Sequence, residues 1–186
     1  MPGAHDNRRD LELLARLASG SADALAELYD RQAPSLLRHA IALTRRRADA
    51  EDLVHAVFLK LATTGPELLG VREPQNYLHR MIHTTWIDVQ RRVATGRRVM
   101  EQAEHRISSD DWPFVGGAER GIDIGRALDA LPPVQRQAIV LHVVEGFSFR
   151  EIGRLTGVSL FTAAGRYRLA IGRLRDALRT TSGEKR

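Results

Sequence analysis

The spacing of hydrophobic residues is helical along most of the chain. Apolar positions recur every three or four residues between 11 and 17, between 25 and 29 and between 36 and 41. No segment alternates with period two for long enough to predict a strand. The pattern therefore predicts an all-α protein.

Start and stop signals divide this pattern into separate helices. Asp10 and Ser21 are predicted N-caps, and Gly20 is expected to end the first helix. Pro34 is expected to interrupt or restart the second helix. A further helix is expected to open at Asp49.

A loop separates two longer amphipathic segments. Residues 63–73, TTGPELLGVRE, are predicted to form it because they are rich in glycine and proline. The apolar residues before it are too many for one narrow stripe, so part of this set is expected to be exposed: Leu53, Val54, Val57 and Phe58. The helix after it is expected to begin at Pro74. Its apolar side is expected to consist of Leu78, Met81, Ile82, Thr85 and Val89.

The composition changes near residue 94. Residues 96–119 are polar, contain glycine and proline, and show no sustained apolar stripe. Helical patterning resumes at Ile122. The sequence therefore predicts two helical domains, residues 1–95 and 120–186, joined by a linker at residues 96–119.

The amino-acid composition excludes several kinds of functional site. The 186 residues include no cysteine, which excludes disulfides, a thiol nucleophile and cysteine-based zinc sites. No apolar run reaches the ~18 residues of a membrane span, so a cytoplasmic protein without membrane contact is expected. Residues 1–119 hold 16 basic and 17 acidic side chains, whereas residues 120–186 hold 12 and 6. The positive end suggests a segment that faces nucleic acid, although a solvated surface would look the same.

The stretch from Ser148 to Arg175 contains six arginines and one acidic residue. Ser148 and Glu151 form an S-x-x-E capping box at the start of a short predicted helix. Gly153 lets another helix pass close by, Gly157 suits the left-handed end of the helix, and Ser159 suits the next N-cap.

The predicted second helix has one packing face and one basic face. Ala163, Tyr167, Ala170 and Leu174 fall together on one side, and the arginines fall mainly elsewhere. This is the pattern of a helix-turn-helix that reads DNA, and a purely structural helix pair is the alternative.

Three stretches together resemble the extracytoplasmic-function (ECF) sigma factors of the sigma-70 family. LPPVQRQAIVLHVVEGFSFREIGRLTGVS resembles region 4, RADAEDLVHAVFLKL resembles region 2.2, and YLHRMIHTTWIDVQRR resembles regions 2.3 and 2.4. The resemblance covers residues 10–93 and 120–179 in the family's order. It implies a region 2 helical bundle, a region 4 helix-turn-helix and a promoter-specificity subunit that catalyses nothing itself.

The resemblance assigns the binding of core RNA polymerase to the helix that starts at Asp49. In the family this surface docks on the clamp helices of the β′ subunit, and region 4 meets the β flap. His55 and Ala56 stand where the family usually has Gln and Glu. The residues that the resemblance places in the polymerase contact are Asp49, Asp52, Leu53, His55, Ala56 and Phe58.

The resemblance assigns the minus-10 element to residues 74–93 and to the loop before them. In the family the helix opens the duplex, and the loop captures a flipped base, which needs a pocket with a stacking wall. Thr84 replaces the usual Asn, so base preference there is expected to differ. The candidate contacts are Tyr77, His79, Arg80, His83, Thr84, Asp88, Arg91 and Arg92.

The second helix of region 4 is expected to enter the major groove of the minus-35 element. Arg166 and Arg168 are the expected base readers, because arginine pairs bidentately with guanine. Phe161, Gly165 and Leu169 depart from the family's usual Gly, Ser and Arg, which implies an unusual promoter sequence. The candidate contacts are Ser148, Arg154, Thr162, Ala164, Gly165, Arg166, Arg168, Leu169 and Arg173.

The expected partners are core RNA polymerase and promoter DNA, and members of the family often have an anti-sigma factor as well. No cofactor, metal or catalytic residue is expected: His79 and His83 stand four residues apart, but no H-E-x-x-H motif or third ligand accompanies them. Two other functions remain open, a dimeric helix-turn-helix regulator that acts without core polymerase and a structural interaction protein.

Overall fold

The structure is a computed structural model of the chain, and it describes residues 7–95 and 118–183. No residue of these two ranges lies in a β-strand, so the all-α class is confirmed. Contacts divide the chain into two compact units, residues 1–40 with 51–102 and residues 41–50 with 103–186. The predicted linker lies almost entirely outside the described residues, so the domain boundaries stay a prediction. None of the described helices combines the length and hydrophobicity that crossing a membrane requires.

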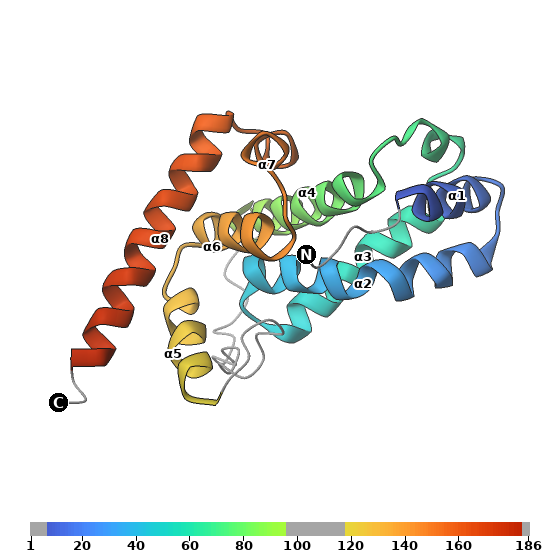
Figure 1. Cartoon of the computed structure of the whole chain (residues 1–186). Coiled ribbons are helices and arrows are strands. Elements are labelled where there is room, and N and C mark those ends of the chain that lie inside the picture. Colours follow the sequence, from blue (N-terminus) through green and yellow to red (C-terminus); the bar gives the residue numbers. More distant parts are fainter. Residues whose placement is uncertain (1–6, 96–117, 184–186) are drawn as a thin grey trace. The chain divides into compact units, whose positions relative to one another are not determined.

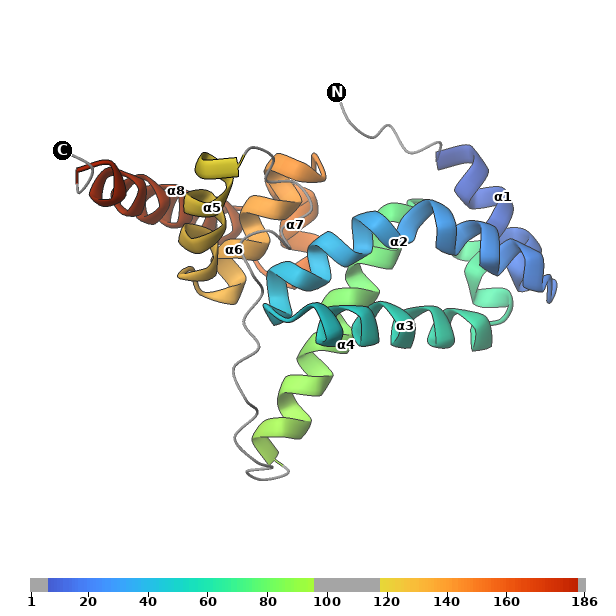
Figure 2. The ribbon, with the colours of Figure 1, turned by 90° about the horizontal axis from the view of Figure 1, so that it is seen from below.

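Four α-helices and one short 3₁₀ helix lie between residues 7 and 95 (Figures 1 and 2): α1 (Asn7–Ala18), α2 (Ala22–Thr44), α3 (Arg47–Thr63), η1 (Pro66–Gly70) and α4 (Pro74–Thr95). Helix α1 packs against η1 and α4. Helices α2 and α3 run side by side in both views. All five elements contribute fully buried aliphatic side chains: Leu13, Leu14, Leu28, Leu36, Leu61, Leu68, Leu78 and Ile82.

Two predicted helix signals in this part are wrong. Asp10 lies inside α1 instead of capping it, and its side chain is buried. Its carboxylate accepts hydrogen bonds from Arg31 Nε at 2.8 Å and from Gln32 Nε2 at 2.6 Å, and thereby ties α1 to α2. Pro34 does not break a helix, because α2 continues through it. Burial of neighbouring side chains such as Leu36 offsets the backbone hydrogen bond that proline cannot make.

The other signals near residues 21–74 are closer to the structure. Ser21 Oγ accepts a hydrogen bond from Ala24 N at 3.4 Å, as expected of an N-cap. Helix α3 begins at Arg47, slightly before the predicted Asp49. Pro74 is the first residue of α4, as predicted, and the loop before it contains η1. Val89 is exposed, so its predicted place on the buried side of α4 is wrong.

Helix α3 buries its apolar residues more completely than predicted. Leu53, Val54, Val57 and Phe58 are all buried, so the expectation that part of this set is exposed is wrong. The ring of Phe58 packs edge-on against Tyr29 of α2, with 4.8 Å between the ring centroids. Leu59 is a large apolar residue of α3 that is exposed, and it retains 60% of its accessible surface.

The C-terminal part consists of α5 (Ala118–Asp129), α6 (Pro133–Ile139), the π-helical turn η3 (Val140–Val144), α7 (Phe149–Thr156) and α8 (Leu160–Gly183) (Figure 1). Helix α8 is the common support, because α5, α6 and α7 each pack against it. The predicted resumption of helical structure at Ile122 comes slightly after the observed start of α5.

A buried arginine holds the end of α5 against α6. Arg136 of α6 is fully buried, and its Nη1 donates to the carbonyl oxygen of Leu131 at 3.0 Å. The same nitrogen lies 3.4 Å from the carbonyl oxygens of Leu128 and Asp129. Burial lowers the pKa of Arg136 to about 10, so the guanidinium remains protonated at neutral pH and can donate to these carbonyls.

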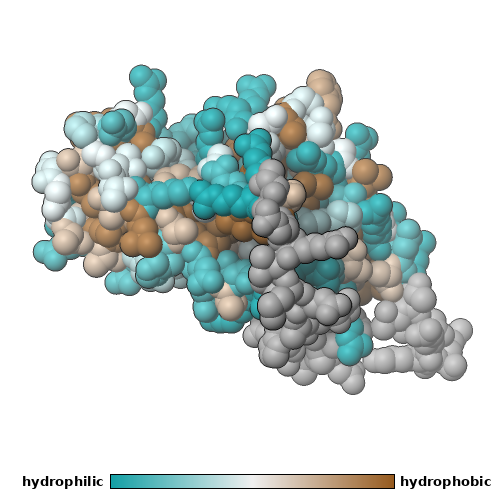
Figure 3. All heavy atoms as spheres, turned by 180° about the vertical axis from the view of Figure 1, so that it is seen from behind, coloured by the Kyte–Doolittle hydropathy of each residue, from teal (hydrophilic) through white to brown (hydrophobic). Residues whose placement is uncertain are grey.

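The molecular surface is mixed in character. The face in Figure 3 is mostly hydrophilic, and hydrophobic atoms appear on it in separate patches between polar ones. Single exposed apolar residues are normal in soluble proteins. Leu59, Phe161 and Leu169 are of interest because each lies on a helix that carries functional candidates.

Candidate nucleic-acid interface

Both ends of α7 and the start of α8 are fixed by the local signals that the sequence predicted. Ser148 Oγ accepts a hydrogen bond from Glu151 N, and the Glu151 carboxylate accepts one from Ser148 N at 2.8 Å, which completes a capping box. Gly157 ends α7 in the left-handed conformation, with φ 73°. Ser159 Oγ accepts from Thr162 N at 3.0 Å and caps α8. These three predictions are confirmed.

Gly153 sets the close approach between α7 and the start of α8. A Cβ atom at this position would lie 2.8 Å from the carbonyl oxygen of Val158 and 3.3 Å from the amide nitrogen of Leu160. Both atoms belong to the backbone, so they cannot move aside as a side chain could. The predicted need for a residue without a side chain is confirmed.

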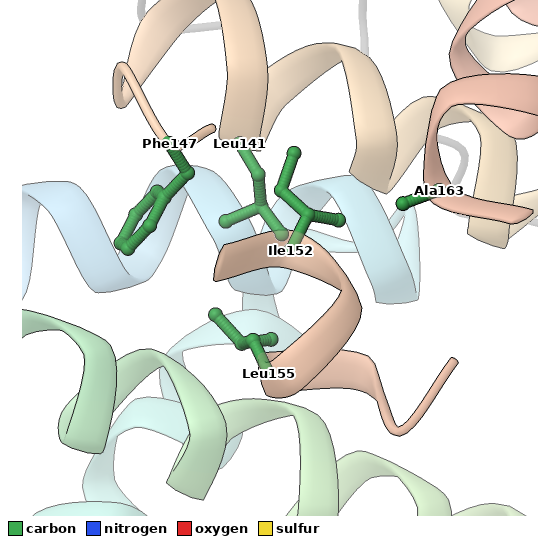
Figure 4. Close-up of a cluster of buried hydrophobic side chains, with 5 residues drawn as sticks. All are labelled: Leu141, Phe147, Ile152, Leu155 and Ala163. Carbon is green, nitrogen blue, oxygen red and sulfur yellow. The ribbon is translucent and has the colours of Figure 1, made fainter. Parts of the chain in front are cut away.

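A small hydrophobic core holds the helix-turn-helix together (Figure 4): Leu141, Phe147, Ile152, Leu155 and Ala163. Phe149 and Val158 are partly buried and pack against this cluster. The buried Ile152 and Leu155 confirm the predicted inner face of α7. The cluster joins η3, α7 and α8, and it therefore fixes the angle at which α8 is presented.

Helix α8 has one packing face and one exposed face. Ala163 and Ala170 are completely buried. Tyr167, on the same side, packs edge-on against His142, with 5.0 Å between the ring centroids. Arg168 and Leu169 are exposed. The predicted separation of an apolar and a basic face is therefore confirmed for this part of α8.

The predicted minus-35 residues are not equally accessible. Ala164, Gly165 and Arg166 are half-buried, whereas the other candidates are exposed: Ser148, Arg154, Thr162, Arg168, Leu169 and Arg173. Three exposed candidates already have partners within the chain. The Ser148 hydroxyl bonds to Glu151, Thr162 Oγ1 lies 2.9 Å from Ser159 Oγ, and Arg173 Nη1 donates to Gln135 Oε1 at 2.8 Å.

Five predicted minus-10 residues lie on one face of α4. Tyr77, Arg80, Thr84, Asp88 and Arg91 follow each other at spacings of three or four residues, so they form one stripe along the helix. Tyr77 is half-buried and the other four are exposed. Arg92, also exposed, lies beside the end of this α4 stripe. The arrangement presents an aromatic ring at one end and two arginines at the other.

His79 and His83 are buried in the core, so their prediction as surface contacts to DNA needs correction. They lie outside the α4 stripe, on the buried side of the helix. His79 Nε2 lies 3.1 Å from Ser35 Oγ, and its Nδ1 lies 3.0 Å from Nδ1 of His39, both on α2. Among the described residues no group of three or more metal-ligating side chains could hold an ion.

The exposed face of α3 differs from the predicted polymerase contact. Leu53 and Phe58 are core residues, which removes their side chains from the surface. Asp52 and His55 are exposed, and Asp49 and Ala56 are half-buried. Leu59 shares the face of Asp52, His55 and Ala56 at helical spacing, but the prediction missed it. The burial of Leu53 and Phe58, on the other side of the helix, identifies that face.

Two family models match the chain in separate segments. Residues 28–95 match "Sigma-70 region 2", and residues 122–174 match "Sigma-70, region 4". The first segment contains α3 and the α4 stripe, and the second contains the helix-turn-helix. The order of the two regions agrees with the order expected from the sequence.

Relatives match across both regions. The chain is 30% identical to the RNA polymerase sigma factor CarQ of Myxococcus xanthus, with 89% of this chain and 95% of CarQ covered. It is 33% identical to the ECF RNA polymerase sigma factor SigE of Mycolicibacterium smegmatis, with 85% of this chain covered but only 63% of SigE.

Two solved structures share the fold. CnrH, solved in complex with the cytosolic domain of CnrY, has a TM-score of 0.64 at 22% identity and covers 92% of this chain and 98% of its own. The sigma factor RpoE from Bartonella quintana, solved with the anti-sigma factor NepR, has a TM-score of 0.60 at 23% identity and covers 82% and 97%. Together with the two family models and the relative CarQ, the sequence and its helix-turn-helix establish that this chain belongs to the ECF group of the sigma-70 family of RNA polymerase sigma factors.

Proposed function

We propose that this sigma factor binds core RNA polymerase through the exposed face of α3 and directs it to promoters with two dissimilar boxes. The α4 stripe faces the downstream minus-10 box, and the exposed face of α8 enters the upstream minus-35 box. The observation that carries this proposal is the presence, on one chain, of a capped helix-turn-helix and a second helix with its own exposed polar stripe.

The polymerase contact is assigned to Asp52, His55, Ala56 and Leu59. These residues share one face of α3, and the opposite face fills the core. An apolar residue bordered by polar ones suits a partner helix, because the leucine loses water on binding while the polar edge keeps the surface soluble. Core RNA polymerase is the partner that family membership supports for this face.

This contact has a direct test. Asp52→Arg and Leu59→Ala are each expected to weaken co-purification with core polymerase and to leave the helix content unchanged by circular dichroism. Leu69→Ala is the matched control, since Leu69 is also an exposed leucine but lies on η1. Unchanged affinity of both α3 variants for the core enzyme would contradict the assignment.

The exposed side chains of the α4 stripe and of α8 suit contacts with DNA. Arginines at the end of the α4 stripe supply charge for phosphates, a contribution that does not depend on sequence. Tyr77, at the other end, supplies a ring on which an extruded base can stack. On α8, Arg168 supplies the fork-shaped donor group that matches the edge of guanine.

Binding is the chain's whole contribution in this proposal, and the catalytic centre belongs to core polymerase. The protein acts where the polymerase and the chromosome are, in the cytoplasm of a bacterium. An anti-sigma factor belongs to the proposal as a regulatory partner. Its support is family membership together with the solved neighbour RpoE, which was crystallised with its anti-sigma factor NepR.

Run-off transcription with purified core polymerase tests the function as a whole. Addition of this chain is expected to produce transcripts from a selected set of promoters that core polymerase alone does not use. A dimeric helix-turn-helix regulator would instead bind palindromic DNA without core polymerase. Binding of that kind, without transcripts that depend on the chain, would contradict the proposal and favour the regulator.

A further inference from the structure

The exposed face of α8 carries apolar side chains as well as arginines. Phe161 retains 82% of its accessible surface and Leu169 retains 60%, although both lie on the helix that packs into the region 4 core. They are two helical turns apart and on the side away from the buried Ala163 and Ala170. Arg168 is exposed on the same side.

These two side chains are not part of the hydrophobic cluster that holds the helix-turn-helix together. Its core is filled by other residues, with Phe149 and Val158 at its edge. Gly165 lies between Phe161 and Leu169, one turn from each, and a Cβ atom there would meet nothing within 4 Å. The helix backbone is therefore open to a partner at the point between the two apolar side chains.

The charge of α8 favours DNA as the partner of this face. The segment from Leu160 to Arg175 contains four arginines and no acidic residue. Phe161 is the second residue of α8, and the N-terminal residues of the second helix in a helix-turn-helix are those that reach base edges. In the major groove, an apolar side chain recognises the C5-methyl group of thymine, the one apolar group on the base edges.

We propose that Phe161 and Leu169 read thymine methyl groups in the same minus-35 box that Arg168 contacts. This inference rests on the proposed function and adds the bases that this chain selects. Eight residues of helix span about 12 Å, which corresponds to about three or four base-pair steps of 3.4 Å. The two thymines therefore belong to different base pairs of the same box.

The experiment replaces thymine by uracil, which lacks only the methyl group. A minus-35 library is first selected with holoenzyme assembled from core polymerase and this chain. Each thymine of the selected box is then changed to uracil in turn. At two positions the change is expected to weaken holoenzyme binding about fourfold, which corresponds to ~0.8 kcal/mol for one methyl group.

Variants of Phe161 and Leu169 show which of the two side chains contacts each methyl group. Phe161→Ala is expected to weaken binding to the thymine box and to abolish the effect of uracil at one position. Leu169→Ala is expected to do the same at the other position. Val143→Ala is the matched control, because Val143 is 59% exposed in region 4 but lies on η3. It should leave both uracil effects intact.

Three results would overturn the inference while the proposed function stands. The first is a selected minus-35 box that contains no thymine. The second is equal holoenzyme binding to the thymine and uracil forms of that box. The third is that Phe161→Ala and Leu169→Ala each weaken holoenzyme binding to the thymine form and to the uracil form by the same factor. Equal weakening together with lower affinity for core polymerase would place a protein partner on this face instead. A library from which holoenzyme enriches no sequence at all would contradict the proposed function itself, and this inference with it.

Discussion

His39 of α2 and His79 of α4 stack on one another in the protein core, with their Nδ1 atoms 3.0 Å apart and their ring centroids 5.1 Å apart. Both side chains are completely buried. One Nδ1 must donate and the other accept, so at least one of the two rings is neutral in this arrangement. The pair therefore makes the packing of α2 on α4 sensitive to protonation.

The first prediction follows from the pKa of His39. Burial, and then the proximity of His79 and His83, lowers this pKa well below its usual value. The unfolded chain binds a proton near pH 6.5 while the folded chain does not, so stability is full above that pH and falls as the pH drops below it. We expect a loss of up to ~1.4 kcal/mol per pH unit from this one group.

Hydrogen exchange can locate this effect. Protection of α2 and α4 should decrease between pH 7 and pH 5.5, after correction for the intrinsic exchange rate. His39→Phe retains a ring but cannot titrate, and it should flatten the pH dependence of the free energy of unfolding. His55→Gln is the control, because His55 is exposed on α3. A slope that His39→Phe leaves unchanged would show that another group titrates.

The second prediction contrasts two glycines of region 4. Gly153→Ala places a methyl group 2.8 Å from a backbone carbonyl oxygen, and overpacking of this kind should lower the free energy of unfolding by about 1–3 kcal/mol. Gly165→Ala meets open space in a helix interior and should raise stability by about 0.5–1 kcal/mol. Urea denaturation of the full chain, followed by circular dichroism, measures both. Equal effects of the two variants would contradict the close approach of α7 and α8 at Gly153.

The third prediction separates two roles of Ser148, which is both a helix cap and a candidate contact to the minus-35 element. Ser148→Ala should destabilise α7 by about 1 kcal/mol, and Ser148→Asn should restore most of that stability because asparagine also caps helices. Below the melting temperature of both variants, promoter affinity should then equal that of the parent chain. A loss of affinity in folded Ser148→Ala would show that the hydroxyl also contacts DNA.

The helix-turn-helix was predictable in detail because its determinants are local. The capping box, Gly157 and Ser159 each act within three or four residues, so the sequence alone contains the full interaction. Gly153 was predictable for the same reason, since the backbone that it faces follows it within seven residues.

Long-range partners account for two of the incorrect predictions. In the sequence Asp10 resembles a helix cap, but in the fold its carboxylate accepts hydrogen bonds from Arg31 and Gln32 of α2. In the sequence His79 resembles a surface residue, but in the fold it is buried and has Ser35 and His39 as polar partners. A short-range pattern shows that a residue is polar, but it does not show whether the fold supplies it with a buried partner.

A short-range pattern also does not show which apolar residues of a helix are buried and which are exposed. On α3, four apolar positions and Leu59 all fit a helical pattern, and only packing against neighbouring residues such as Tyr29 decides which side is buried. Phe161 was recognised in the sequence as a departure from the family but not as a site residue. Its exposure on α8 supports the role proposed for it above, which the sequence pattern alone did not assign.

The last prediction distinguishes base reading from attraction by charge. Arg168→Ala should weaken binding to the cognate minus-35 box by about 1–3 kcal/mol and relax the preference at one base pair. Arg166→Ala should follow the same pattern with a smaller effect, because Arg166 is half-buried on α8. Arg91→Ala or Arg92→Ala should weaken all promoters similarly and reduce the slope of log K against log salt by roughly 0.9 for each lost phosphate contact.

Holoenzyme binding to a minus-35 library at two salt concentrations measures both quantities at once. Arg8→Ala is the control for charge alone, since Arg8 is an exposed arginine on α1, outside both candidate DNA surfaces. Arg91 lies 4.0 Å from Asp88, but an exposed pair at this distance stabilises the helix little, so its loss should not mimic a DNA effect. If Arg166→Ala and Arg168→Ala lower affinity uniformly, with every base preference retained, α8 docks on the phosphate backbone and its arginines read no base.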